Sequence, residues 1–187
     1  MIDGENNLTQ RAIRGEASAF GLLYGHYQPK IYRFILLKVS RREEAEDLTH
    51  QVFLSAWTNI GTYAHRGFPF SSWLYQIARN KVIDHYRAKK NELPLHEIDE
   101  EAMPGDYGAV DEMERRLALR KMRAAVKKIK PEYQEIIIMR FVEDLSLKET
   151  AVAIGKSEGA VKLLQHRAIK ALKDILKETE KTKKPSS

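Results

Sequence analysis

The sequence of 187 residues contains no cysteine. Disulfide bonds and thiolate metal sites are therefore excluded, and a reducing compartment is compatible with this composition. No apolar run is long enough to cross a bilayer, and the first residues are acidic and polar, unlike the basic and apolar start of a signal peptide. We therefore expect a cytoplasmic protein that does not insert into a membrane.

Motifs of enzyme chemistry are also missing. The six histidines are scattered, and the sequence has neither a His-Glu-x-x-His zinc motif nor a glycine-rich loop that could cradle a phosphate. Alternating strand patterns are absent as well. We expect a protein that is not an enzyme, with no catalytic residues, no metal and no cofactor.

What the chain does contain is positive charge and helical periodicity. The net charge of +6 suits a polyanionic partner, although the same charge would fit a ribosomal or membrane-surface protein. Helical spacing runs over 8–90, breaks in the Pro-, Gly- and acid-rich stretch 91–111, and resumes over 112–178, before a polar tail at 179–187. The sequence predicts an all-α fold of two small helical domains joined by a flexible acidic linker. Pro29 either kinks or interrupts a helix of the first domain.

The segment 145–168 has the pattern of a helix-turn-helix. Gly155 supplies the positive φ that the turn needs, and the hydroxyl of Ser157 can cap the second helix. The side of that helix opposite its apolar stripe is predicted to face DNA, and its candidate contacts are Ser157, Gly159, Lys162, Leu163, His166, Arg167 and Lys170. An ordinary helical hairpin with a solvated basic face would give the same pattern.

A second surface lies on the predicted helix 42–60, whose apolar positions are Ala45, Leu48, Val52 and Ala56. Its opposite side is acidic and carries one exposed leucine; the residues are Glu44, Asp47, Gln51 and Leu54. Because DNA would repel such a strip, we expect it to meet a basic protein surface, with the leucine as an apolar anchor. The alternative is a solvated face with one stray leucine.

A third surface combines the loop 61–70 with the following helix, which ends near residue 90. The loop candidates are Tyr63, His65, Arg66 and Phe68, and the helix candidates are Arg79, Asn80, Ile83 and Arg87. Aromatic rings interleaved with cations suit single-stranded nucleic acid, because bases stack on rings while cations follow the phosphates. Trp73 and Leu74 are more typical of a core than of a contact surface.

Together, 44–57, 70–90 and 145–172 resemble, in this order, the motifs of the extracytoplasmic-function sigma factors of bacterial RNA polymerase, in the sigma-70 family. The resemblance implies an initiation factor that binds core polymerase and promoter DNA in duplex and single-stranded form. Asp47 and Gln51 would contact polymerase, the loop from Tyr63 to Phe68 would capture a flipped minus-ten base, and the helix-turn-helix would read the minus-thirty-five element. It also implies an anti-sigma factor that holds the protein inactive until a signal arrives.

Departures from the family pattern leave the promoter sequence undetermined. His50 stands where Gln or Glu is common, and Leu163 and Leu164 replace a frequent polar and basic pair. A linker of about 20 residues has a coil span of roughly 25 Å and an extended reach near 65 Å, so polymerase would be the scaffold that fixes the domain spacing. The linker is either a plain tether or a segment that follows a basic channel of polymerase.

One alternative function explains part of the pattern. A stand-alone helix-turn-helix transcriptional regulator, acting without core polymerase, would account for 145–168, with a first domain that senses a ligand or dimerises. It would leave the acidic strip and the aromatic, basic loop without a role.

Overall fold

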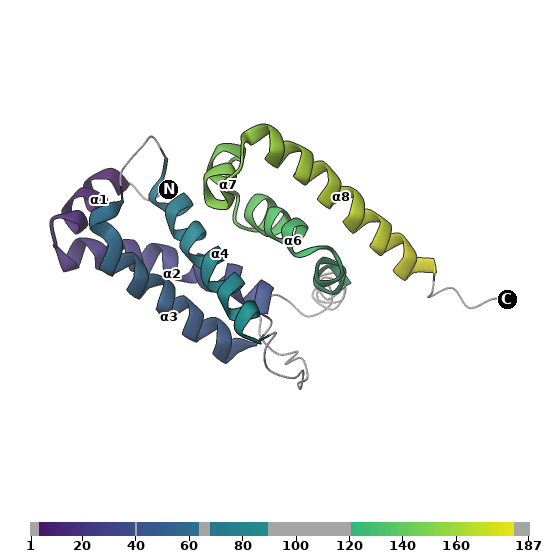
Figure 1. Cartoon of the computed structure of the whole chain (residues 1–187), viewed down its shortest axis with the longest axis horizontal. Helices are drawn as coiled ribbons and strands as arrows, with labels where there is room; N and C mark the ends of the chain where they lie inside the picture. Colours follow the sequence, from purple (N-terminus) through teal and green to yellow (C-terminus); the bar gives the residue numbers. More distant parts are fainter. Residues whose placement is uncertain (1–3, 40, 64–67, 90–120, 182–187) are drawn as a thin grey trace, which may run out of the picture.

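The computed structural model describes residues 4–39, 41–63, 68–89 and 121–181, and every regular element in these ranges is helical. The first group of elements is α1 (Glu5–Ile13), α2 (Ala17–Val39), α3 (Arg42–Asn59), η1 (Ile60–Thr62) and α4 (Phe70–Lys89). The second is a helical segment that ends at residue 128, then α6 (Pro131–Ile137), η2 (Ile138–Val142), α7 (Leu147–Ile154) and α8 (Glu158–Lys181). Figure 1 shows the two groups as neighbouring lobes, and the predicted all-α, two-domain fold is confirmed.

The sequence predicts a first domain at 8–90, and the described helices in this part of the chain run from Glu5 in α1 to Lys89 in α4. The predicted linker, 91–111, lies outside the described residues. Helix α8 continues to Lys181, into the start of the predicted tail.

The first domain is built around α2, which packs against α1, α3 and α4. Pro29 does not interrupt α2, because the helix runs through it and the ring lies on an exposed face. Helix α3 buries the predicted stripe of Ala45, Leu48, Val52 and Ala56. Two aromatic pairs, Phe20 with Trp57 and Tyr24 with Phe53, join α2 to α3 at centroid distances of 4.9 and 4.7 Å.

In the second domain, local sequence signals explain where the helices begin and end. Pro131 begins α6, where a missing backbone N–H costs nothing. Ser146 and Glu149 form a reciprocal capping box at the start of α7. Gly155 adopts φ 68° in the turn, and the hydroxyl of Ser157 accepts a hydrogen bond from the Ala160 N–H at 3.2 Å. The predicted helix-turn-helix geometry is therefore present.

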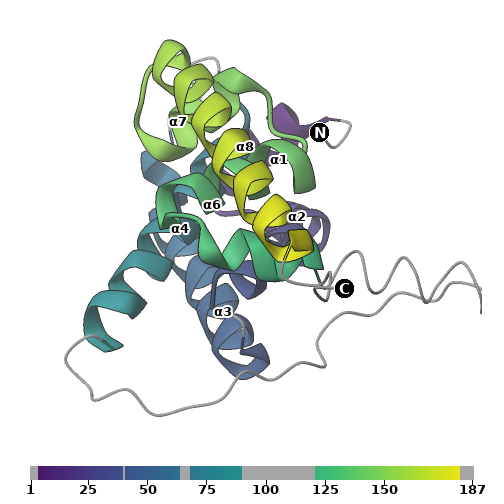
Figure 2. The same cartoon turned by 90° about the vertical axis from the view of Figure 1, so that its right-hand side faces the viewer.

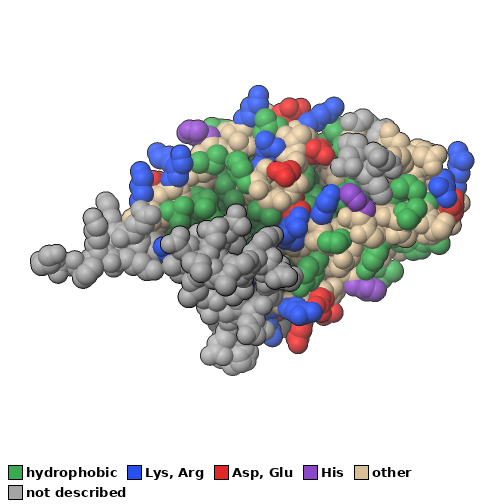
Figure 3. Space-filling view, turned by 180° about the vertical axis from the view of Figure 1, so that it is seen from behind, with side chains coloured by type: hydrophobic (Ala, Val, Ile, Leu, Met, Phe, Trp, Pro, Cys, Tyr) green, Lys and Arg blue, Asp and Glu red, His purple; other side chains and the backbone are tan. Residues whose placement is uncertain are grey.

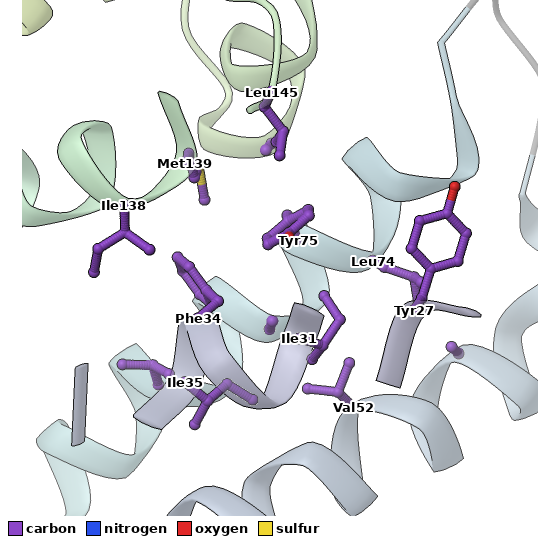
Figure 4. Close-up of a cluster of buried hydrophobic side chains, with 14 of the residues drawn as sticks. Tyr27, Ile31, Phe34, Ile35, Val52, Leu74, Tyr75, Ile138, Met139 and Leu145 are labelled. Atoms are coloured by element: carbon purple, nitrogen blue, oxygen red, sulfur yellow. The ribbon is translucent and has the colours of Figure 1, made fainter. Parts of the chain in front are cut away.

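The two domains pack directly against each other, with α4 against α7 and α2 against η2. Figure 4 shows side chains of both domains in one buried cluster, where Phe34 and Tyr75 of the first domain approach Ile138, Met139 and Leu145 of the second. In the turned view the second domain lies across α4 and α2 (Figure 2). The sequence suggested that an external scaffold was needed to fix the domain spacing, but the apolar side of η2 supplies an internal contact.

Candidate nucleic-acid and protein interfaces

The acidic side of α3 divides into an open part and a paired part. Asp47 and Gln51 are exposed, and the side chain of Leu54 reaches solvent with 59% of its surface accessible. Figure 3 shows the molecule from behind, where hydrophobic side chains reach the surface in several places beside basic ones. An exposed leucine next to a carboxylate and an amide is suited to a protein partner, because the apolar contact supplies area and the polar groups supply orientation.

Glu44, at the start of the same helix, is tied to α4. Its carboxylate accepts hydrogen bonds from Lys89 Nζ at 2.6 Å and from Arg41 at 3.2 Å, and it lies 3.1 Å from His85 Nε2. Burial opposes its ionisation, but the hydrogen bond from Lys89 and the neighbouring cations hold the pKa of Glu44 below its usual value. Sequence spacing placed Glu44 on the open face, whereas its role in the structure is to join α3 to α4.

The predicted base-capturing loop is described at its two ends only, since His65 and Arg66 lie outside the described residues. Tyr63 is 8% exposed, and its hydroxyl donates a hydrogen bond to the Phe68 carbonyl at 2.9 Å. Its ring packs on Phe70 and Trp73 at centroid distances of 5.5 and 5.3 Å. Burial, and then the charge of Glu5, raise the pKa of Tyr63 to about 12. Here Tyr63 shapes the loop from inside, whereas the sequence suggested an exposed stacking ring.

Phe68 at the other end of the loop is half-buried and faces the second domain. Lys148 Nζ of α7 lies 5.2 Å from the centroid of its ring, within the range of a cation–π contact. The ring therefore sits beside the helix-turn-helix in this arrangement of the domains.

Glu5 is a buried residue of this region that the sequence reasoning missed. One oxygen of its carboxylate accepts a hydrogen bond from the Phe70 N–H at 2.9 Å, and the other accepts one from the Tyr27 hydroxyl. The carboxylate thus lies at the N-terminus of α4, where the helix dipole favours negative charge. No local signal marks Glu5, because it stands among polar residues at the start of the chain and its partners come from α2 and α4.

The outward side of α4 is partly covered. Asn80 and Arg87 are exposed, and Ile83 is half-buried. Arg79, in contrast, is 27% exposed and donates a hydrogen bond from Nε to Glu135 of α6 at 2.9 Å. One of the predicted DNA contacts on this helix is therefore occupied by a carboxylate of the second domain.

The predicted DNA-facing side of α8 is open to solvent. Its exposed residues are Ser157, Gly159, Lys162, Leu163, His166, Arg167 and Lys170. On the opposite side Val161 and Ala168 are fully buried. Arg140 of η2 supports the helix, because its guanidinium donates hydrogen bonds to the side chain of Gln165 at 2.9 Å and to the Leu145 carbonyl. This contact, which spacing alone did not indicate, ties α8 to η2 and to the segment that precedes α7.

Among residues 4–39, 41–63, 68–89 and 121–181, no group of three or more histidine, aspartate or glutamate side chains could hold a metal ion. Within the same ranges, no helix has both the length and the apolar character needed to span a membrane.

Comparison with known proteins identifies the family. A family model described as Sigma-70 region 2 matches residues 23–92, and one described as Sigma-70, region 4 matches residues 119–172. The chain is 31% identical over 169 residues to the ECF RNA polymerase sigma factor SigD of Mycobacterium tuberculosis, covering 87% of this chain and 79% of SigD. The chain belongs to the ECF sigma factors.

Two further similarities concern a second relative and a solved structure. The chain is 39% identical over 177 residues to the ECF RNA polymerase sigma factor BldN of Streptomyces coelicolor, covering 90% of this chain and 64% of BldN. The sigma factor RpoE of Bartonella quintana, whose structure was solved in complex with the anti-sigma factor NepR, superposes with a TM-score of 0.69 at 22% identity over 84% of this chain and 96% of RpoE. The second likeness shows that the fold is shared.

Proposed function

We propose that this ECF sigma factor binds core RNA polymerase through the acidic side of α3 and directs promoter-specific initiation without catalytic activity of its own. Asp47, Gln51 and Leu54 form the proposed contact, and Glu44 holds the edge of this face against α4. The observation that carries the proposal is an exposed acidic and apolar strip on one domain and an exposed basic recognition helix on the other, in a chain of this family. We place its action in the cytoplasm, with polymerase.

The proposed minus-thirty-five contact is the exposed side of α8. Arg167 has the fork geometry for a guanine edge, Leu163 can touch a thymine methyl, and Lys170 can pair with a phosphate. Lys162 and His166 lie on the same side. The N-terminal end of the helix, where Ser157 and Gly159 are exposed, presents backbone N–H groups that suit a phosphate.

The proposed minus-ten contact joins the loop to the outward side of α4. His65 and Arg66 lie between the two loop ends, and Phe68 offers a ring for stacking. Asn80, Ile83 and Arg87 follow on α4, with Arg79 one turn before Ile83. Because Tyr63 is packed against the core, we propose that it holds the loop in shape, and a stacking role for its ring requires the loop to rearrange.

An anti-sigma factor is part of the proposal. RpoE of Bartonella quintana, which shares the fold, was solved with such a partner. Sequestration by an anti-sigma factor would keep the exposed side of α3 from polymerase until a signal arrives.

The test is capture of core polymerase by the purified chain, followed by mapping of transcription starts on genomic DNA. We expect a stable complex with core polymerase and starts at a discrete set of promoters. A chain that binds promoters tightly by itself but does not bind core polymerase would instead be a stand-alone helix-turn-helix regulator, and this proposal would fail.

A further inference from the structure

Three cations of the first domain find their acidic partners in the second domain. Arg33 of α2 donates two hydrogen bonds to the two carboxylate oxygens of Glu143, at 2.7 and 2.8 Å. Arg79 of α4 pairs with Glu135 at 2.9 Å, and Lys38 Nζ of α2 lies 3.8 Å from the other oxygen of that carboxylate. Within the described ranges, no acidic side chain of the first domain pairs with any of the three.

The two carboxylates are well covered. The side chain of Glu143 has no exposed surface and also accepts a hydrogen bond from the Tyr75 hydroxyl at 2.9 Å, while that of Glu135 is 7% exposed. Lys38 itself is 4% exposed and donates a further hydrogen bond to the Pro131 carbonyl at 3.1 Å. Burial lowers the pKa of Lys38, and the attraction of Glu135 offsets this only in part.

The geometry suits an oxyanion in general. A guanidinium that binds both oxygens of a carboxylate presents the same two parallel N–H groups to a phosphate. Lys38 and Arg79 reach one carboxylate together, so their charged groups converge on a single anion position. Arg33 and Lys38 lie on α2 and Arg79 lies on α4, where the next residue, Asn80, is exposed. Removing the second domain would leave these three cations without their carboxylate partners.

We propose that Arg33, Lys38 and Arg79 form a binding surface for the phosphates of the unpaired promoter strand, which the second domain covers in the free chain by placing Glu135 and Glu143 where phosphates bind. This rests on the proposed minus-ten role of α4 and adds two residues of α2 to it. The closed chain and the DNA-bound chain exclude each other, because the same donors cannot serve a carboxylate and a phosphate at once.

The linkage between closure and DNA binding makes the proposal measurable. If only the open chain binds the strand, the apparent affinity equals the intrinsic affinity multiplied by the open fraction. A variant that opens the chain therefore gains affinity, while loss of a cation from the covered surface removes that gain. A merely structural ion pair would behave differently, since either partner could be removed with the same effect on DNA binding.

The experiment uses the full chain and a fluorescein-labelled 20-nucleotide single strand of mixed sequence. Closure is followed by small-angle X-ray scattering, and binding by fluorescence anisotropy at several salt concentrations. The opening variant is E135Q/E143Q, and the test variant adds R33A to it. A matched control, E132Q/D174N, makes the same charge change at two exposed acids of the second domain.

We expect E135Q/E143Q to increase the radius of gyration and to bind the strand about three- to tenfold more tightly than the native chain, which corresponds to a native open fraction of about 10 to 30%. Adding R33A should leave the chain open but remove one phosphate contact, so the slope of log affinity against log salt should fall by about 0.7. Adding R42A instead, which removes an exposed arginine of α3, should leave the slope unchanged.

Three results would overturn the proposal. One is a compact E135Q/E143Q chain that binds no better than E132Q/D174N. Another is an open E135Q/E143Q chain with no gain over that control. The third is a slope that R33A does not change.

If E135Q/E143Q does not fold, R33A alone is measured in holoenzyme. Open promoter complexes formed with R33A should dissociate at lower salt concentration than those formed with the native chain. An unchanged salt concentration for dissociation would refute the proposal. Binding of core RNA polymerase through α3 is measured in a separate assay. Failed capture by the native chain would therefore count against the sigma-factor proposal, whereas normal capture with no effect of R33A would count only against this surface.

Discussion

Replacement of Glu5 by alanine should destabilise the first domain and loosen the start of α4. The carboxylate is buried and accepts hydrogen bonds from the Phe70 N–H and the Tyr27 hydroxyl. Removing it leaves two buried donors without this acceptor, and each unsatisfied donor costs about 1 to 3 kcal/mol. With two such donors, we expect a total loss of about 2 to 6 kcal/mol in the free energy of unfolding.

Urea denaturation followed by circular dichroism measures this loss, with Y27F as the matched control. That variant removes one of the two donors together with its hydrogen bond and leaves the contact with Phe70 intact. It should therefore cost only about 0.5 to 1.5 kcal/mol. If E5A and Y27F were equally stable, or if E5A cost less than about 0.5 kcal/mol, the idea that Glu5 anchors the N-terminus of α4 would be wrong.

Other predictions concern the exposed faces. D47R should abolish capture of core polymerase in a pull-down while changing the unfolding free energy by less than about 0.5 kcal/mol, because the side chain is exposed; undiminished capture would remove α3 from the interface. R167A should cost about 1 to 3 kcal/mol on matched promoters only, whereas K170A should weaken binding to all sequences and lower the salt slope by about 0.9, both measured by holoenzyme titrations. Equal behaviour of these two variants would refute the assignment. The folded-state pKa of Glu44 is lowered, so its contribution to stability is present above its unfolded pKa of about 4.3 and disappears as pH falls through the folded value. In E44Q the free energy of unfolding should depend less on pH in that range. An unchanged pH dependence would show that the ion pairs of Glu44 with Lys89 and Arg41 are too solvated to contribute to stability.

Features with local causes could be predicted from the sequence. The buried side of α3 follows from apolar residues at helical spacing, and the turn before α8 follows from the glycine at 155 and the capping serine at 157. In each case the interacting residues lie within four positions of one another, or share a helix face. Such patterns report on backbone geometry directly.

Features that depend on residues far apart in the sequence could not be predicted from it. Tyr63 stands in a stretch with cations, which is typical of a stacking surface, but its ring is buried against Phe70 and Trp73 of α4. Glu135 and Glu143 look like ordinary surface acids, since charged residues are seldom buried without a partner. Their partners lie 56 and 110 positions away in the sequence, and no local spacing records such pairs.

The contact between the domains combines two kinds of interaction with different consequences. The apolar side of η2 packs on Phe34 and Tyr75, and burial of such side chains supplies most of the favourable free energy of a contact. Buried ion pairs contribute little net stability, because desolvation offsets their attraction, but breaking one partner away is costly. The ion pairs of Arg33 and Arg79 therefore determine the relative position of the two domains more than they determine the free energy of the contact. If Arg33, Lys38 and Arg79 bind phosphates as proposed, covering them with carboxylates would restrict strand binding at this surface to conditions in which the domains are held apart. On the proposed function, polymerase would hold the domains apart so that α4 and α8 reach the minus-ten and minus-thirty-five elements, and the strand-binding surface would then be exposed only where a promoter is being opened.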